Sequence, residues 1–357
     1  MGFLGKAIKV SDGLGIWMNV CMRFREGDLI EDVNGIIFDV KGLVHPPGRV
    51  VAFPRFIPDV KGGRMRGNLA YRKIYALSVR YELLEKQFPQ YLVQNDVVGE
   101  KLCEVPINLI KRHYRPIEKL QELRARKQWD SLERRALDFV SLLKETAGIT
   151  WDALGVSGSI LVNLHTASSD IDPVVYGVEN CRRVYSVLKS LFNEEKSGAK
   201  PYTKEELQTL FNFRSKDTRM SFEDFVRTES RKVFQGKYFG HDYFVRCIKD
   251  WDEVGESYGD VRYSNVGYAR VKAMVADASE AIFTPCTYKI GNVEFLEGAN
   301  VERVSEIVSF RGRFCEQAEN GEVVVAQGKL EHMQSKAGWK RFRLLLGSQP
   351  SDFMILS

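Results

Sequence analysis

The stretch GVSGSILVNLHTASSDIDPVVYG, residues 155–177, decides the fold expected for this chain. A Gly-Ser pair, Gly158 and Ser159, precedes two aspartates, Asp170 and Asp172, that lie two residues apart. Side chains two apart on an extended strand project from the same face, roughly 7 Å apart. Their carboxylates repel each other unless a cation lies between them, and Mg²⁺ prefers carboxylate oxygens combined with phosphate oxygens. The stretch therefore predicts a site for a metal ion and a phosphate.

The Gly-Ser pair supplies the phosphate side of this expected site. Gly158 allows the backbone to approach a ligand closely, and a helix beginning near Ile160 would point free N–H groups at a phosphate. The ten residues between Ser159 and Asp170 suffice for about two helical turns and a return loop. Such an arrangement would place phosphate and metal ions in one pocket, as an in-line attack at phosphorus requires.

These residues also carry a family resemblance. Gly158-Ser159, the ten-residue interval and Asp170-Ile171-Asp172, followed by Val-Val-Tyr, resemble the signature of the DNA polymerase beta superfamily of nucleotidyltransferases. A longer segment, from about residue 26 to the C-terminus and including IIFDVKGLVHPP and EAIFTPCTY, is similar to a group of predicted nucleotidyltransferases typical of archaea.

The resemblance implies an α+β fold with a DNA polymerase beta-like core over about residues 148–250. It implies that a nucleoside triphosphate (NTP) is the substrate and that Asp170 and Asp172 bind two Mg²⁺ ions. It further implies that Gly158 and Ser159 contact the phosphates. The expected reaction transfers a nucleoside monophosphate to an acceptor hydroxyl.

Members of this superfamily usually supply a third carboxylate from a neighbouring strand. Asp242 in GHDYFVRCIK is our candidate, because it opens the next apolar strand, although it could equally form an ion pair with Lys237 or Arg246. Asp277 in AMVADAS is the rival. A weak internal similarity between residues 40–54 and 271–285 would place Asp277 in a separate β module, so we rank it second.

Pro173 departs from the family pattern, because an apolar residue usually follows the second aspartate. Proline cannot donate a hydrogen bond to a sheet, so we expect the strand to be an edge at this point. This departure keeps open an alternative function, that of a non-catalytic nucleic-acid-binding protein that retains the nucleotidyltransferase fold.

The rest of the chain predicts β-rich modules on both sides of the core. Residues 28–60 have the pattern of a β hairpin region. Asp130 with Glu133 resembles a capping box for a helix that ends at Gly148. Short strands return after residue 261. Asn180 is the expected cap of the helix after the acidic strand. The expected domains are an N-terminal β-rich module at 1–115, a basic helical connector at 116–147, a nucleotidyltransferase core at 148–260 and a C-terminal all-β domain at 261–357.

Basic residues are concentrated in one segment. Residues 111–135 contain nine basic and four acidic side chains, a net charge of +5 that equals that of the whole chain. Lys111, Arg112 and Arg115 surround Tyr114, an arrangement that suits a nucleic-acid backbone with base stacking. On charge distribution, RNA is therefore our first expectation for the acceptor.

Two further signals are weaker. Arg64 and Arg66 lie in a glycine-rich loop that could also contact nucleic acid, and His165 could touch the triphosphate, although a loop histidine is more often solvated. The six cysteines form no CxxC pair, which argues against a zinc site or a disulfide framework. The sequence lacks a signal-peptide core and a membrane-length apolar stretch, so we expect a cytoplasmic protein with no membrane partner.

Overall fold

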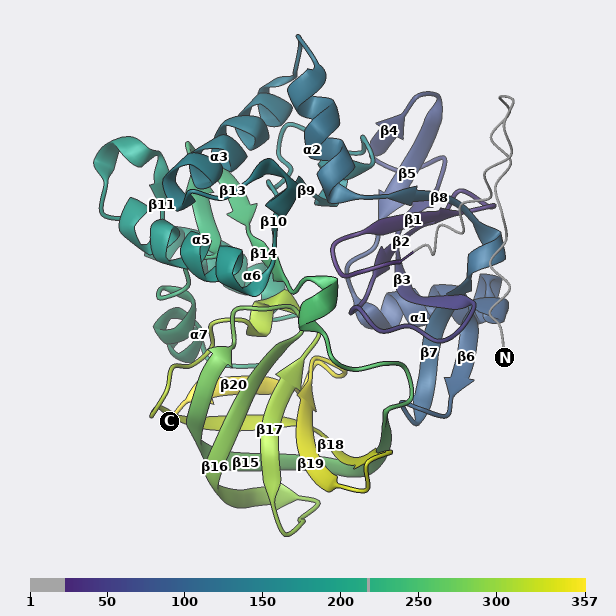
Figure 1. The fold of residues 1–357 in the computed structure, drawn as a ribbon, viewed down its shortest axis with the longest axis vertical. Coiled ribbons are helices and arrows are strands. Elements are labelled where there is room, and N and C mark those ends of the chain that lie inside the picture. The colour runs from purple at the N-terminus through teal and green to yellow at the C-terminus, as the bar shows by residue number, and fades with distance from the viewer. Residues whose placement is uncertain (1–22, 217–218) are drawn as a thin grey trace.

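The computed structural model describes residues 23–216 and 219–357 and has a mixed α+β fold, as the sequence predicts. Three regions adjoin one another: an N-terminal β module, a central region of helices and short sheets, and a C-terminal β barrel (Figure 1). Because the central region contains the Gly-Ser pair and both aspartates, the other two regions matter chiefly for what they bring to its surface.

The N-terminal module is built on one sheet whose main path is β4-β5-β3-β2-β1-β8, with β7 pairing to β3 and to β6. The predicted hairpin region is confirmed, since β2 pairs antiparallel with β3. Its elements are β1 (Leu29–Asp32), β2 (Ile37–Val40), β3 (Arg49–Pro58), β4 (Arg64–Arg66), β5 (Leu69–Lys73), α1 (Leu77–Gln87), β6 (Leu92–Asn95), β7 (Glu100–Pro106) and β8 (Ile110–Tyr114).

The central region contains two small sheets, β14-β10-β9 and β11-β12-β13, and a bridge between Ile171 and Tyr243 joins them. Its helices are α2 (Pro116–Ala125), α3 (Ser131–Ala147), α4 (Gly158–Leu161), α5 (Val178–Leu191), α6 (Lys204–Arg214) and α7 (Phe222–Glu229). Its strands are β9 (Leu154–Val156), β10 (Pro173–Tyr176), β11 (Ala199–Lys200), β12 (Gln235–Tyr238), β13 (His241–Phe244) and β14 (Arg246–Ile248).

Helix α3 confirms the sequence interpretation of its two ends. Asp130 accepts hydrogen bonds from the backbone of Leu132 and Glu133, and Gly148 adopts the left-handed conformation that closes the helix. The apolar stripe of α3 is buried in the same core as residues of α2 and of the central strands. Residues 116–147 are therefore part of the central region and not a separate connector.

Two local expectations for the central region are wrong. Helix α5 begins at Val178 after Gly177, which has a φ of +89°, while the Asn180 amide donates to the carbonyl of Tyr176 instead of capping the helix. The helix expected after the Gly-Ser pair is a single turn, α4, and most of the interval before Asp170 is loop.

The C-terminal residues form strands that close into a barrel. Its strands are β15 (Val261–Glu280), β16 (Cys286–Gly298), β17 (Val304–Ser309), β18 (Val323–Ser335), β19 (Lys340–Leu346) and β20 (Phe353–Leu356). They follow the order β15-β16-β17-β19-β18, and β18 pairs back to β15 to close the barrel. With β17 and β19 parallel, this is the strand order of an OB-type Greek-key barrel.

The internal similarity between the two ends does not correspond to a repeated unit. Val40 is the last residue of β2 and Val44 lies in a loop, whereas Val271 and Val275 both lie inside the long strand β15. Strands of similar composition account for these matches.

The two faces of β10 and of residues 170–172 before it pack against different parts of the protein. Ile171 and Val175 are buried in the core shared with α3 and α5. Val174 instead packs in a cluster with Leu43 of the N-terminal module, and successive side chains of a strand alternate between faces. The face that carries Asp170 and Asp172 is therefore turned toward the N-terminal module.

Within residues 23–216 and 219–357, the helices are all too short or too polar to cross a membrane.

Candidate functional site

Three carboxylates lie on one face of the two joined sheets of the central region, which we call the central sheet. Ile171 donates a hydrogen bond to the carbonyl of Asp242 (2.8 Å) and accepts one from Phe244 (2.9 Å), which pairs Ile171 with Tyr243 in parallel. The residues on either side of a bridged pair project from the face opposite to that pair. Asp170, Asp172 and Asp242 therefore point the same way, and we call the surface that they share the acidic face. The side chains of Asp170 and Asp242 are 42% and 50% exposed. The three acidic residues favoured from sequence therefore share one face, although they are not among the residues whose ligand atoms all lie within 4.8 Å of one another in the described part of the chain.

The rival carboxylate lies elsewhere. Asp277 is on β15 of the barrel, where it accepts hydrogen bonds from Lys289 Nζ and from the backbone N–H of Ser279, each at 2.9 Å. Asp242 does form the ion pair with Lys237 that the sequence allowed, at 3.0 Å. That pair leaves Asp242 half-exposed on the acidic face, so it remains a candidate.

The electrostatics of the face bear most strongly on Asp172. Burial, followed by repulsion from Asp170, raises the pKa of the Asp172 carboxyl to about 7. Lys73 of β5 opposes this effect, with Nζ 4.0 Å from Asp170 Oδ1. A pair of this kind with a half-exposed carboxylate is worth at most about 1 kcal/mol, so it does not remove the repulsion.

The Gly-Ser turn lies directly against Asp172. Gly158 has a φ of +64°, and a Cβ at this position would lie 1.8 Å from Asp172 Oδ2. The backbone N–H of Ser157 donates to the carbonyl of Asp172 at 2.8 Å. Glycine is therefore required here both for the backbone conformation and for the close approach of the carboxylate.

Ser159 adds a polar group to this turn. The residue is 2% exposed, and its hydroxyl has no hydrogen-bond partner among the residues that the structure describes. A buried hydroxyl without a partner costs about 1–3 kcal/mol, so such a group calls for a ligand or another explanation.

Pro173 does not lie on an edge strand, which corrects the expectation from sequence. Strand β10 is the middle strand of its sheet, with β9 on one side and β14 on the other. Ile171 pairs with Tyr243, and three residues later on both strands Val174 pairs with Arg246, so the register is the same on both sides of the proline. Pro173 interrupts the hydrogen-bond ladder without shifting it, and the three carboxylates stay aligned.

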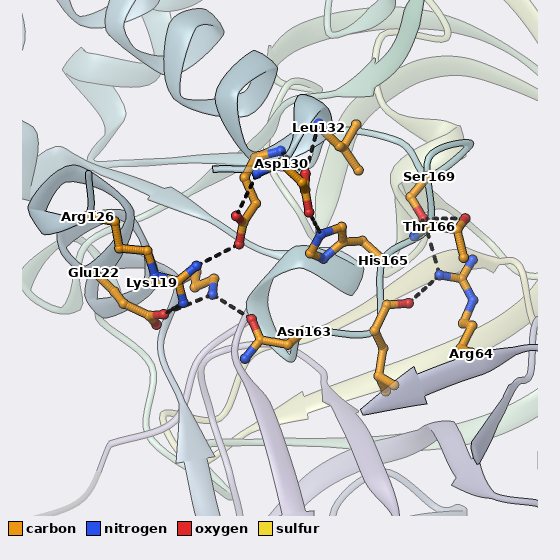
Figure 2. Close-up of polar contacts among 12 residues, drawn as sticks. Arg64, Lys119, Glu122, Arg126, Asp130, Leu132, Asn163, His165, Thr166 and Ser169 are labelled. Carbon is orange, nitrogen blue, oxygen red and sulfur yellow. Dashed lines mark hydrogen bonds and ion pairs between the residues drawn. The ribbon is translucent and has the colours of Figure 1, made fainter. Parts of the chain in front are cut away.

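The loop between α4 and the acidic residues is held by three different elements (Figure 2). Lys119 of α2 donates to Asn163 Oδ1 at 2.7 Å, and Nε2 of His165 lies 2.7 Å from Oδ2 of Asp130 at the start of α3. From β4, the Arg64 guanidinium donates to the carbonyl of Leu164 at 2.5 Å. These contacts fix the position of the loop and hence the spacing between the Gly-Ser turn and Asp170.

Arg64 and His165, which the sequence suggested as ligand contacts, instead form hydrogen bonds that hold this loop. The Arg64 guanidinium also donates to Ser169 Oγ, at 3.2 Å. Together with the pairing of His165 to Asp130, this makes both side chains structural supports of the site.

Asp130, Glu133 and His165 are close enough together to hold a metal ion. The carboxylates of Asp130 and Glu133 already have partners, however. Asp130 caps α3, and Glu133 forms an ion pair with Arg126 at 2.8 Å. The group is accounted for as a helix cap and an anchor for the loop.

The basic residues proposed for nucleic-acid contact are not gathered on one surface. Lys111 and Arg112 are neighbours on β8 and therefore project from opposite faces. The Arg112 guanidinium lies 4.6 Å from the centre of the Tyr114 ring, and Arg115 forms an ion pair with Glu118. Arg66, expected in a glycine-rich loop, is the last residue of β4 and donates to the hydroxyl of Tyr114 at 2.9 Å.

Sequence reasoning missed the side chains that the N-terminal module contributes to the acidic face. Lys73 is the clearest, and Arg55 lowers the pKa of Asp172 through its charge, as Lys73 does. Neither lies in a motif, and their distance from Asp170 along the chain gives no local signal. Their contribution depends on how the two regions pack together.

Comparison with known proteins places the chain in a family. It is 31% identical over 340 residues to "Uncharacterized protein MJ1086" of Methanocaldococcus jannaschii, an alignment that covers 93% of this chain and 98% of that protein. The chain therefore belongs to the same family as this archaeal protein. No family model matches the chain, and no solved structure matches it.

Proposed function

We propose that this protein is a nucleotidyltransferase, which transfers a nucleoside monophosphate from an NTP to an acceptor hydroxyl. One observation carries the proposal: Asp170, Asp172 and Asp242 share one face of the central sheet, and the Gly158 backbone lies against the Asp172 carboxylate. Acidic side chains beside a glycine turn are the combination that binding of a metal–triphosphate complex needs.

Asp170, Asp172 and Asp242 are the residues that would hold the two Mg²⁺ ions, since carboxylate oxygens are the ligands that Mg²⁺ prefers. Burial and, after it, repulsion from Asp170 raise the pKa of Asp172, and a bound cation would relieve the repulsion. When bound, the ions would supply charge neutralisation on the phosphate oxygens and activation of the acceptor hydroxyl.

The chain itself would orient the triphosphate and shield its charge. The absence of a side chain at Gly158 lets the Asp172 carboxylate lie against the turn, and the unpaired Ser159 hydroxyl would donate to a phosphate oxygen. Lys73 places a positive charge at the Asp170 end of the face. Asp172 must be ionised to bind metal, so triphosphate binding should weaken below about pH 7.

For the acceptor, RNA remains our first proposal, on the charge of residues 111–135. The barrel has the strand order of OB folds, which often bind oligonucleotides. The exposed side chain of Glu294 on β16 would nevertheless repel a phosphate backbone, and Glu297 on the same strand is paired with Arg270 at 2.8 Å, so the outer surface of this strand is a poor candidate for RNA contact.

Transfer of label tests the proposal. The purified protein is incubated with Mg²⁺, total RNA and NTPs labelled at either the α- or the γ-phosphate. We expect α-label in the RNA, no γ-label, and loss of incorporation in Asp172→Asn. Asp277→Asn, which removes the rival carboxylate in the barrel, is the matched control and should retain activity.

The alternative function is a nucleic-acid-binding protein that does not catalyse transfer. Salt-sensitive RNA binding without incorporation of label from any of the four NTPs would favour this alternative. Transfer of the γ-label instead would indicate a kinase and contradict nucleotidyl transfer.

A further inference from the structure

A pair of exposed aromatic rings lies beside the acidic face, where regions distant in sequence meet. Tyr75 follows β5 in the N-terminal module, and Phe213 lies near the end of α6 in the central region. Their ring centres are 5.3 Å apart with planes at 84°, an edge-to-face contact. The two residues are nevertheless 44% and 50% exposed, so each ring keeps a surface open to a ligand.

Lys73 connects this pair to the carboxylates. Its ammonium group lies 4.0 Å from Asp170 Oδ1 and 4.8 Å from the centre of the Tyr75 ring. The Arg55 guanidinium lies 5.1 Å from the same ring centre. Two cations therefore lie over the Tyr75 ring, which stays partly exposed and is one side chain away from the acidic site.

Both rings are carried on anchored backbone. Ile74, next to Tyr75, is buried, and its N–H donates to the carbonyl of Arg55 at 2.9 Å. Arg214, next to Phe213, donates to Glu229 at 2.6 Å and to Gln235 at 2.9 Å. The rings thus need little ordering when a ligand binds, which favours affinity.

The position of the pair also gives a direction to the bound molecule. Gly158 lies against Asp172, whereas Lys73 and Tyr75 lie at the Asp170 end of the face. If the β- and γ-phosphates lie by the Gly-Ser turn, the nucleoside extends from the α-phosphate toward the opposite end. A flat ring with neighbouring cations is a suitable surface for a nucleobase.

We infer that Tyr75 and Phe213 form the base-binding surface for the NTP. This inference rests on the proposed nucleotidyl transfer and adds the residues that would distinguish a nucleoside triphosphate from triphosphate alone.

Calorimetry with two kinds of probe tests the inference. The affinities of each of the four common ribonucleoside triphosphates and of inorganic tripolyphosphate, all with Mg²⁺, are measured for the parent, Tyr75→Leu and Phe213→Leu. Base stacking predicts that at least one variant binds its preferred nucleotide roughly 5- to 100-fold more weakly. Affinity for tripolyphosphate should be unchanged.

Trp339→Leu provides the matched control. Trp339 also has a neighbouring cation, with the Arg341 guanidinium 4.9 Å from its ring centre, but it lies between β18 and β19 of the barrel. This variant should bind every probe as the parent does. Melting curves of all variants establish that they are folded.

Three results would overturn the inference. Unchanged nucleotide affinity in both ring variants would exclude stacking while leaving nucleotidyl transfer intact. Equal weakening of nucleotide and tripolyphosphate would assign the rings a role in positioning Lys73. A parent protein that binds neither probe would contradict both this inference and the proposed function.

Discussion

Replacement of Gly158 by alanine should damage triphosphate binding far more than stability. The residue has a φ of +64°, and the left-handed conformation costs a non-glycine residue about 1–2 kcal/mol. The new Cβ would also lie 1.8 Å from Asp172 Oδ2, whereas ordinary contacts begin at 3.4 Å. The carboxylate would therefore have to retreat by more than about 1 Å, a displacement that can reduce the function of a site roughly 100-fold.

Gly148→Ala separates these two effects. Gly148 has nearly the same φ, +61°, but a Cβ there would meet no atom of residues 23–216 and 219–357 within 4 Å. Gly148→Ala should lose about 1–2 kcal/mol of unfolding free energy in urea titrations, and Gly158→Ala should lose at least as much, because its Cβ must also displace the Asp172 carboxylate. Only Gly158→Ala should show the roughly 100-fold loss of affinity for the Mg²⁺–triphosphate complex in calorimetry. If the two variants bind the complex equally well, the reasoning about the Gly158 contact is wrong.

Three further predictions concern the charges. Asp170→Asn combined with Asp172→Asn should abolish Mg²⁺-dependent triphosphate binding while leaving the metal-free melting temperature equal or higher, and a large fall would indicate a structural role. Folding raises the pKa of Asp172 from 3.8 to about 7, so the metal-free protein should lose stability as pH rises through this range. In denaturation experiments at several pH values, Asp172→Asn should show a smaller loss of stability over the same range. If Lys111, Arg112 and Arg115 all contact RNA phosphates, replacing them by alanine should make the slope of log affinity against log salt concentration less steep by roughly 2 to 3. An unchanged slope would contradict that contact.

The acidic stretch could be interpreted from sequence because its geometry is local. The two-residue period of a strand places Asp170 and Asp172 on one face whatever surrounds them, and the position of Asp242 at the start of an apolar strand indicated a neighbour in the same sheet. The ends of α3 were equally local, since Asp130, Glu133 and Gly148 act within a turn of the helix.

Local rules failed where tertiary packing or a neighbouring residue prevailed. Pro173 suggested an edge, but the strand pairs in one register on both sides of it and stays in the centre of the sheet. Asn180 suggested a cap, but Gly177 turns the chain earlier. Lys73, Tyr75 and Phe213 gave no sequence signal because only the packing of the N-terminal module against the central region brings them together.

Crystals grown with Mn²⁺ and a non-hydrolysable NTP analogue provide the most direct test of the metal–triphosphate site. The account predicts anomalous scattering peaks between Asp170, Asp172 and Asp242, with the triphosphate against Gly158 and Ser159. Manganese or the analogue bound elsewhere, with these carboxylates uncoordinated, would contradict it.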